Sequence, residues 1–287
     1  MSDMPISENM AASLGEIRTH DHDRFLTLLF APMPQRQSLI ALYAFNLEIA
    51  RVAESVTEPM MGHIRLQWWR ETLEGVPRGE TRGHAAAIAL QEAMLDNSGN
   101  PDPAALQPLI DARERDLSDD VFADMAALES YAEATSSSLM ALAAQALGGT
   151  EKAAAAGEAI RHAGLAYALT GLLRALPFHA SQGRLKMPAD LLQKHNVDPH
   201  SILTGKMTDG LRGVMRDVAD RARSHLALAR AARFDPALLP ALMPASLCER
   251  YLDLMTAPGF DPFLIRTDVS VIRRQLRLLG RNLRKRI

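Results

Sequence analysis

The sequence predicts an all-α protein that folds as a single-domain helical bundle with a central cavity. Apolar residues recur three or four positions apart in one segment after another, and no segment shows a convincing strand alternation. Of the 287 residues, 47% are hydrophobic but only 5% are aromatic, and the abundance of Ala, Leu and Met favours helices over sheets. No loop is long enough to act as an interdomain linker, so we expect a tail over residues 1–20 and one helical domain over residues 21–287.

The predicted helices are separated by turn-forming residues. The first begins at Asp21 or Asp23, and a long Ala-rich helix ends at the glycine pair 148–149, which is a C-cap signal. The cluster of turn formers at residues 97–103 marks the clearest loop. The periodic segments, in chain order, are residues 21–31, 34–55, 62–75, 83–95, 103–117, 125–149, 151–176, 210–234, 236–255 and 268–287.

Composition excludes several classes of protein. A net charge of -2 argues against a general nucleic-acid binder. The single cysteine, Cys248, excludes an intramolecular disulfide and a thiolate zinc cluster. The first residues contain acids and lack an apolar core, so they predict neither a signal peptide nor an Arg-rich presequence, and no apolar run is long enough to span a bilayer. We expect a cytoplasmic protein, either soluble or peripheral on the inner face of the cytoplasmic membrane.

Three local patterns each have a functional and a structural interpretation. The stretch HDHDR at residues 20–24 offers metal ligands, but its aspartates favour an N-terminal helix cap. Adjacent Trp68 and Trp69 cannot share a helix face, so we expect one in the core and the other against a partner, a ligand or a cavity wall. The segment DARERDL at residues 111–117 has the spacing of ordinary ion pairs, Asp111 with Arg115 and Asp116 with Arg113, or of the edge of a polar cavity. Common hydrolase and nucleotide-binding motifs do not occur in the sequence.

Several stretches together resemble the squalene/phytoene synthase family, over about residues 21–230. They are RFLTLLFAP, LIALYAFNLEIARV, IRLQWWRETLEG, LIDARERDL, YAEATSSSLMALAAQALG and HAGLAYALTGLLRAL followed by GRLKMP. The resemblance implies the all-helical terpenoid synthase fold and enzymes that join two prenyl diphosphates. In such enzymes two aspartate-rich motifs hold Mg²⁺ against the leaving diphosphate, and Mg²⁺ neutralises its charge.

The positions that would carry those aspartates have lost most of their carboxylates. In the first motif they fall on Ala50, Arg51 and Glu54, and in the second on Ala175, Phe178 and His179. No acid remains from Arg174 to Met187, and Pro177 is expected to kink the second helix. We therefore expect no catalytic residues and no metal or other cofactor; Mg²⁺ would be needed only by an active enzyme. Candidates for binding a ligand are Arg51, Glu54, Asp111, Asp116, Tyr131, Arg174, His179 and Arg184.

Three functions remain compatible with this pattern. The sequence resembles a non-catalytic branch of the family that acts in assembly of respiratory complex I, which implies complex I subunits or other assembly factors as partners. Because that branch is mitochondrial and no presequence is predicted here, we expect a bacterial relative. One alternative is a prenyltransferase with a site rebuilt from Glu54, Asp111, Asp116 and His179. The other is an isoprenoid- or lipid-binding protein whose apolar cavity holds a polyprenyl or quinone tail.

The C-terminal segment predicts an amphipathic helix with a basic surface. Its apolar residues Ile272, Leu276, Leu279 and Leu283 form one stripe. The structural interpretation is a terminal helix that docks on the bundle through this stripe. The alternative is peripheral contact with an anionic membrane through its basic residues. The candidate partner or membrane contacts are Trp68, Trp69, Arg277, Arg281 and Arg284.

Overall fold

The chain folds into two compact helical units that interleave along the sequence. This structure is a computed structural model, and it describes residues 6–33, 35–80, 82–96, 101–267 and 269–287. The first unit takes the chain up to Ser118, with Leu139–Ala155 and Asp235–Ala241, and the second takes the remaining segments. Because the units alternate along the chain, no single linker separates them. Residues 97–100, within the predicted loop, lie outside the described residues.

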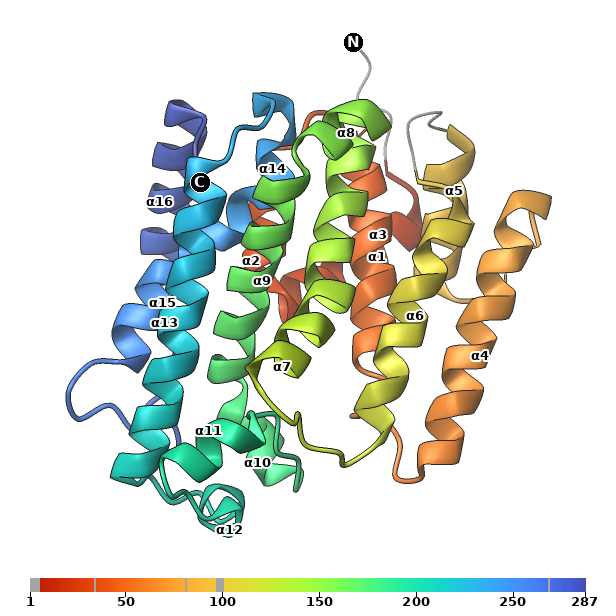
Figure 1. Cartoon of the computed structure of the whole chain (residues 1–287). Coiled ribbons are helices and arrows are strands. Elements are labelled where there is room, and N and C mark those ends of the chain that lie inside the picture. Colours follow the sequence, from red (N-terminus) through yellow and green to blue (C-terminus); the bar gives the residue numbers. More distant parts are fainter. Residues whose placement is uncertain (1–5, 34, 81, 97–100, 268) are drawn as a thin grey trace. The chain divides into compact units, whose positions relative to one another are not determined.

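The first unit is built around helix α3 (Gln35–Ala50), which packs against α1 (Glu8–His20) and α5 (Ala85–Asp96) (Figure 1). Almost every α3 residue from Ser38 to Ile49 is buried. The remaining elements of this unit are α2 (His22–Leu28), α4 (Pro59–Gly75), η1 (Val76–Arg78), η2 (Pro103–Leu106), α6 (Gln107–Glu114), η3 (Arg115–Leu117), most of α8 (Ser138–Ala155), η5 (Pro236–Leu238) and most of α14 (Leu239–Leu242).

Helix α1 corrects the predicted N-terminal tail. Residues 8–20 are helical, and Ser7 caps the helix by accepting a hydrogen bond from the amide of Met10. Met10 and Ile17 lie seven residues apart on one face and are buried, which gives the helix a packed side. The HDHDR stretch at residues 20–24 forms the junction to α2, where the Asp21 carboxylate accepts from the amide of Arg24. The capping interpretation of this stretch is therefore confirmed.

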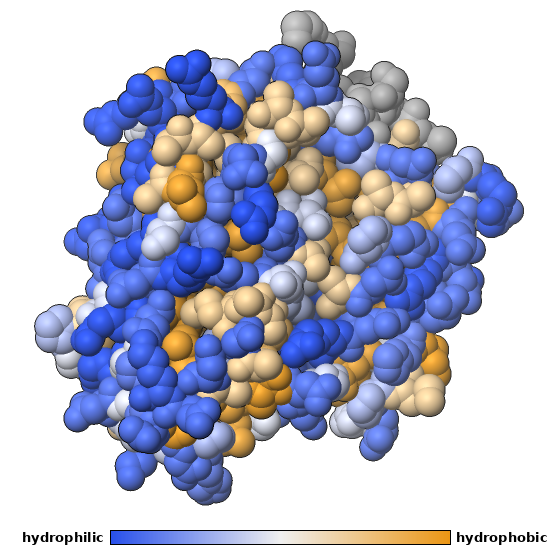
Figure 2. All heavy atoms as spheres, in the orientation of Figure 1, coloured by the Kyte–Doolittle hydropathy of each residue, from blue (hydrophilic) through white to orange (hydrophobic). Residues whose placement is uncertain are grey.

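The second unit is built on two long helices, α9 (Gly157–Arg174) and α13 (Asp209–Ala231), which pack along each other (Figure 1). The apolar residues of α13 follow helical spacing and are buried, while its charged residues cover the outer side. Figure 2 shows this polar covering in blue, with small separate apolar patches. The other elements are α7 (Met125–Ala132), the π-helical turn η4 (Glu133–Ser137), α10 (Leu176–Ser181), α11 (Ala189–Lys194), α12 (Pro199–Leu203), η6 (Met243–Leu247), α15 (Cys248–Met255) and α16 (Val271–Arg284).

Two predicted helix breaks are confirmed. Gly149 interrupts α8 with a φ of 81°, a conformation that side chains disfavour. Helix α9 ends at Arg174, and α10 begins at Leu176 with Pro177 in its first turn. Proline is tolerated there because the first amides of a helix have no intrahelical acceptor. The described residues contain no β-strand, only an isolated bridge between Phe122 and Pro188.

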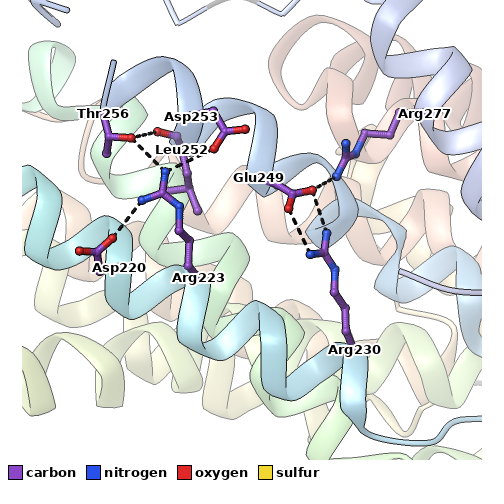
Figure 3. Close-up of polar contacts among 8 residues, drawn as sticks. All are labelled: Asp220, Arg223, Arg230, Glu249, Leu252, Asp253, Thr256 and Arg277. Carbon is purple, nitrogen blue, oxygen red and sulfur yellow. Dashed lines mark hydrogen bonds and ion pairs between the residues drawn. The ribbon is translucent and has the colours of Figure 1, made fainter. Parts of the chain in front are cut away.

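Helix α16 docks on the second unit through a polar side, contrary to the predicted docking by its apolar stripe. Arg277 donates to the Ser246 carbonyl at 2.6 Å and to the Glu249 carboxylate at 2.5 Å. Arg230 of α13 contacts the same carboxylate at 3.2 Å (Figure 3). Leu278 is the one fully buried residue of α16. Ile272, Leu276, Leu279 and Leu283 are all exposed, because the arginine contacts turn the stripe outward.

Candidate functional site

The first motif lies where α3 ends, in the first unit. Ala50 is the last residue of α3, and Arg51 begins the turn that follows. The Arg51 guanidinium pairs with Glu16 of α1 at 3.7 Å, and Glu54 is exposed one turn later. The three motif positions therefore contribute a single carboxylate, next to a cation.

A neighbouring acid, Glu48 on α3, is engaged elsewhere. Its carboxylate contacts the imidazole of His84 at 3.5 Å. The hydrogen bond from His84 holds the pKa of Glu48 below its usual value, and the nearby Arg51 lowers it further. The His84 ring also packs at 5.3 Å from Trp69. Glu48 thus makes a structural contact just before the start of α5, and neither Glu48 nor His84 was singled out from the sequence.

The tryptophan pair separates as the sequence predicts. Trp69 is buried against Phe45, with ring centroids 5.3 Å apart. Trp68 is half-buried, and the Arg82 guanidinium lies 5.6 Å from its ring. Trp68 is therefore the member of the pair that remains open to solvent.

The acids of DARERDL are held by arginines rather than gathered into a site. Asp111 accepts from Arg70 at 2.7 Å, and the same guanidinium reaches Glu114 at 2.6 Å. Asp116 is buried and pairs with Arg113 at 3.3 Å. The predicted Asp116–Arg113 pair is confirmed, whereas Asp111 takes Arg70 of α4 as its partner. These contacts join α4 to α6 and leave Asp111 and Asp116 as parts of ion pairs.

The second motif occupies the break between α9 and α10, in the second unit. Ala175 lies at the break itself, and His179 follows one turn later, half-buried, with its ring 5.7 Å from that of Phe178. The His179 carbonyl accepts a hydrogen bond from the amide of Arg184, which closes the turn at Gly183. The kinked helix thus presents an imidazole and a phenyl ring where the family resemblance implies carboxylates.

A groove of about 510 Å³ opens beside this break. Arg174, Pro177 and Phe178 line one side, and residues 262–267 line the other. The Arg174 guanidinium stacks on Tyr251, 3.8 Å from the ring centroid, which fixes its position by a cation–π contact. Arg266 is the second charged lining residue, so the described residues of the groove walls include two cations and no carboxylate.

Tyr131 lies near a buried lysine in the same unit. The Nζ atom of Lys186 is 6.0 Å from the centre of the Tyr131 ring and 5.9 Å from that of Phe122. Lys186 is only 6% exposed. The segments that carry these residues are joined by backbone bonds, one from the amide of Ala189 to the carbonyl of Phe122. The sequence predicted Tyr131 as a ligand-binding candidate but gave no signal for its proximity to Lys186.

A buried histidine pair links three helices of the second unit and was missed in the sequence. The Nδ1 atoms of His162 on α9 and His225 on α13 lie 2.9 Å apart. His225 also contacts Glu129 of α7 at 2.9 Å. Burial alone would raise the pKa of Glu129, but hydrogen bonds from Arg221 and His225 lower it below its usual value. Histidines this far apart in a sequence carry no pairing signal.

The donor set at the motif positions does not fit Mg²⁺. This ion prefers carboxylate oxygens in octahedral geometry, whereas the motifs offer one carboxylate, an arginine, two alanines, a phenyl ring and an imidazole. Among the described residues, no group of three or more His, Cys, Asp or Glu side chains is placed to hold a metal ion.

The described segments form an all-α fold of the terpenoid synthase-like type, and comparison with known proteins identifies the family. The family model for squalene/phytoene synthase matches residues 17–277, and the chain belongs to this family. A solved dehydrosqualene synthase shares the fold, with a TM-score of 0.80 at 17% identity over 95% of each chain.

Curated relatives of two kinds match the chain. Complex I assembly factor 6 of Bos taurus is 34% identical over 249 residues, which is 86% of this chain and 74% of that protein. The Homo sapiens protein of the same name is 32% identical over the same shares. Presqualene diphosphate synthase of Rhodopseudomonas palustris is 27% identical over 71% of this chain and 72% of its own. None of the described helices is both long and apolar enough to cross a membrane.

Proposed function

We propose that this chain is a non-catalytic member of the squalene/phytoene synthase family that acts in the assembly of respiratory complex I. The observation that carries the proposal is the second motif. Its helix stops at Arg174, resumes after Ala175, and presents Phe178 and His179 in place of acids. Because the segment has no carboxylates, it is not suited to bind Mg²⁺, and no metal ion would neutralise the negative charge of a leaving diphosphate.

The comparisons support the assembly role. The chain aligns over most of its length with proteins named complex I assembly factor 6. We propose subunits of a complex I-like membrane complex, or other assembly factors, as its partners, and no metal or other cofactor for its action. We place it in a bacterial cell at the inner face of the cytoplasmic membrane. The rebuilt prenyltransferase and the isoprenoid-binding protein are not favoured, because the relatives of higher identity carry the assembly-factor name.

The test combines biochemical capture of partners with genetic rescue of a deletion strain. A tagged chain captured from native membranes is expected to retain complex I subunits. Deletion of the gene is expected to lower complex I activity in membranes, and Glu54→Gln is expected to restore it as fully as the unaltered chain. Glu151→Gln, at another exposed acid of the first unit, serves as the matched control. Failure of Glu54→Gln alone would show that the remaining motif carboxylate is required for function and would count against the non-catalytic assignment.

The enzymatic alternative is tested in solution. Purified protein with Mg²⁺ and farnesyl diphosphate is expected to form no head-to-head product. Product above a no-protein blank that disappears in Glu54→Gln would overturn the non-catalytic assignment.

A further inference from the structure

Helix α16 presents a continuous aliphatic stripe to solvent. Ile272, Leu276, Leu279 and Leu283 are 67%, 64%, 47% and 74% exposed. At about 100° of rotation per residue, these four side chains fall within about 60° of one another around the helix. The stripe therefore forms a single apolar edge along the whole helix.

The orientation of this stripe is fixed by what lies on the opposite side of α16. Arg277 is held by the Ser246 carbonyl and the Glu249 carboxylate, and Leu278 is fully buried. To bury the stripe against its own unit, the helix would have to rotate by about half a turn and break both arginine contacts. By contrast, α13 buries its apolar side in the same unit. The stripe is thus available for a partner outside the unit.

The charge around the stripe indicates the chemistry of that partner. Residues 271–287 contain no acid. Arg273, Arg284, Lys285 and Arg286 are exposed on the flanks and at the end of the helix. Burial lowers the pKa of Arg281, and the neighbouring Arg277 and Arg230 lower it further, which shows how closely the cations crowd. A surface that complements this helix must accept aliphatic side chains and bring negative charge.

We propose that α16 is an interfacial membrane helix, which inserts its aliphatic stripe among the acyl chains of a leaflet rich in anionic lipid while the flanking arginines and lysine contact phosphate groups. This inference rests on the peripheral-membrane part of the proposed function and names the surface responsible. An aliphatic stripe with basic flanks is the pattern of helices that lie in the plane of a membrane interface. At 14 residues, α16 is about 21 Å long, too short to span a bilayer.

A site-specific probe tests insertion directly. Cys248 is the sole cysteine and is buried, so an introduced cysteine is labelled selectively. Leu276→Cys carrying an environment-sensitive fluorophore is expected to shift to the blue on adding vesicles of phosphatidylglycerol and phosphatidylcholine. Ile64→Cys, at a similarly exposed apolar position of α4, is the matched control and is expected to stay unchanged. An unshifted label at residue 276, with vesicles in excess, would refute insertion.

Co-sedimentation separates the apolar from the electrostatic contribution. The triple variant Leu276→Gln, Leu279→Gln and Leu283→Gln preserves the charge of the helix. It is expected to partition into vesicles tenfold less or weaker still, because three aliphatic side chains no longer contribute apolar area that is buried in the membrane. Ile64→Gln is expected to partition like the unaltered chain. Unaltered protein is expected to bind less to pure phosphatidylcholine and less at high salt. Circular dichroism verifies that each variant is folded.

Three results of co-sedimentation would also overturn the inference. They are full binding by the triple variant, equal binding to anionic and neutral vesicles, and absence of vesicle binding. If the unaltered chain also self-associates and the triple variant does not, the stripe is a contact between copies of the chain. Complex I capture that persists without vesicle binding would refute this inference alone, whereas loss of capture with intact vesicle binding would refute the assembly role alone.

Discussion

The substitution Gly164→Ala is expected to push α9 away from the π-helical turn η4 and so destabilise the second unit. Gly164 of α9 faces the π-helical turn η4, and a Cβ atom there would lie 2.5 Å from the Ser137 side-chain oxygen and 2.7 Å from the Ser137 amide nitrogen. The backbone Cα of Ser137 is as close, so no side-chain rotation relieves the overlap. Two hydrogen bonds cross the same contact, from Ser136 to the Gly164 carbonyl at 2.9 Å and from Ser137 to the Arg161 carbonyl at 2.8 Å.

The magnitude follows from these contacts. Overpacking of a close contact costs about 1–3 kcal/mol, and each stretched hydrogen bond costs about 1 kcal/mol. Replacing glycine by alanine within a helix returns up to about 1 kcal/mol. The net loss expected for Gly164→Ala is thus about 2–4 kcal/mol in the free energy of unfolding. Gly171→Ala, on the same helix, places its new Cβ more than 4 Å from every atom other than its chain neighbours and the adjacent helix backbone, and is expected to gain about 0.5–1 kcal/mol.

The assay is equilibrium urea unfolding followed by circular dichroism, with both variants beside the unaltered chain. Opposite signs for the two glycines would support the close approach of α9 and η4. A Gly164→Ala protein as stable as the unaltered chain would show that the two elements are not packed as closely as the structure has them.

Two further predictions concern pH. The hydrogen bonds from Arg230 and Arg277 lower the pKa of Glu249 from 4.5 to about 2, so its contribution to stability is present above pH 4.5 and is lost as the pH falls towards 2. The shift corresponds to at most about 3.4 kcal/mol, and solvent screening of this partly exposed group reduces that to about 1 kcal/mol. Acid unfolding of Glu249→Gln should converge on that of the unaltered chain as the pH approaches 2. Burial, and then the charge of His225, lower the pKa of His162, so the free energy of unfolding should fall as the pH drops below 6.5. In His162→Asn, the urea midpoint should depend less on pH between 7.5 and 5.5. An unchanged pH dependence in this variant would count against the histidine pair.

Local physics accounts for the parts of the fold that the sequence predicted. Helical periodicity, the cap at Asp21, the break at Gly149 and the kink at Pro177 all depend on residues close together in the chain. The predicted tail is wrong for residues 8–20, which form α1, because this helix contains few apolar residues. It is held by packing against α3 and α5, which local patterns do not reveal.

The candidate site divides in the same way. Loss of the motif carboxylates is a property of residue identity, so the sequence alone determined that Ala175 and His179 offer no carboxylate for Mg²⁺. Which side chain a charged or polar residue contacts depends on the tertiary structure. Asp111 could have paired with Arg115 one turn away, but α4 brings Arg70 to it, and the histidines of α9 and α13 meet only because the two helices pack together.

The C-terminal helix separates what the sequence determines from what the tertiary structure determines. Its amphipathic pattern is written in the sequence, since the positions of Ile272, Leu276, Leu279 and Leu283 determine that a stripe exists. The pattern does not determine which side of the helix faces the protein. Tertiary structure decided that, because a carboxylate on α15 and a carbonyl of η6 are placed to receive Arg277, and the contacts they make turn the apolar stripe outward.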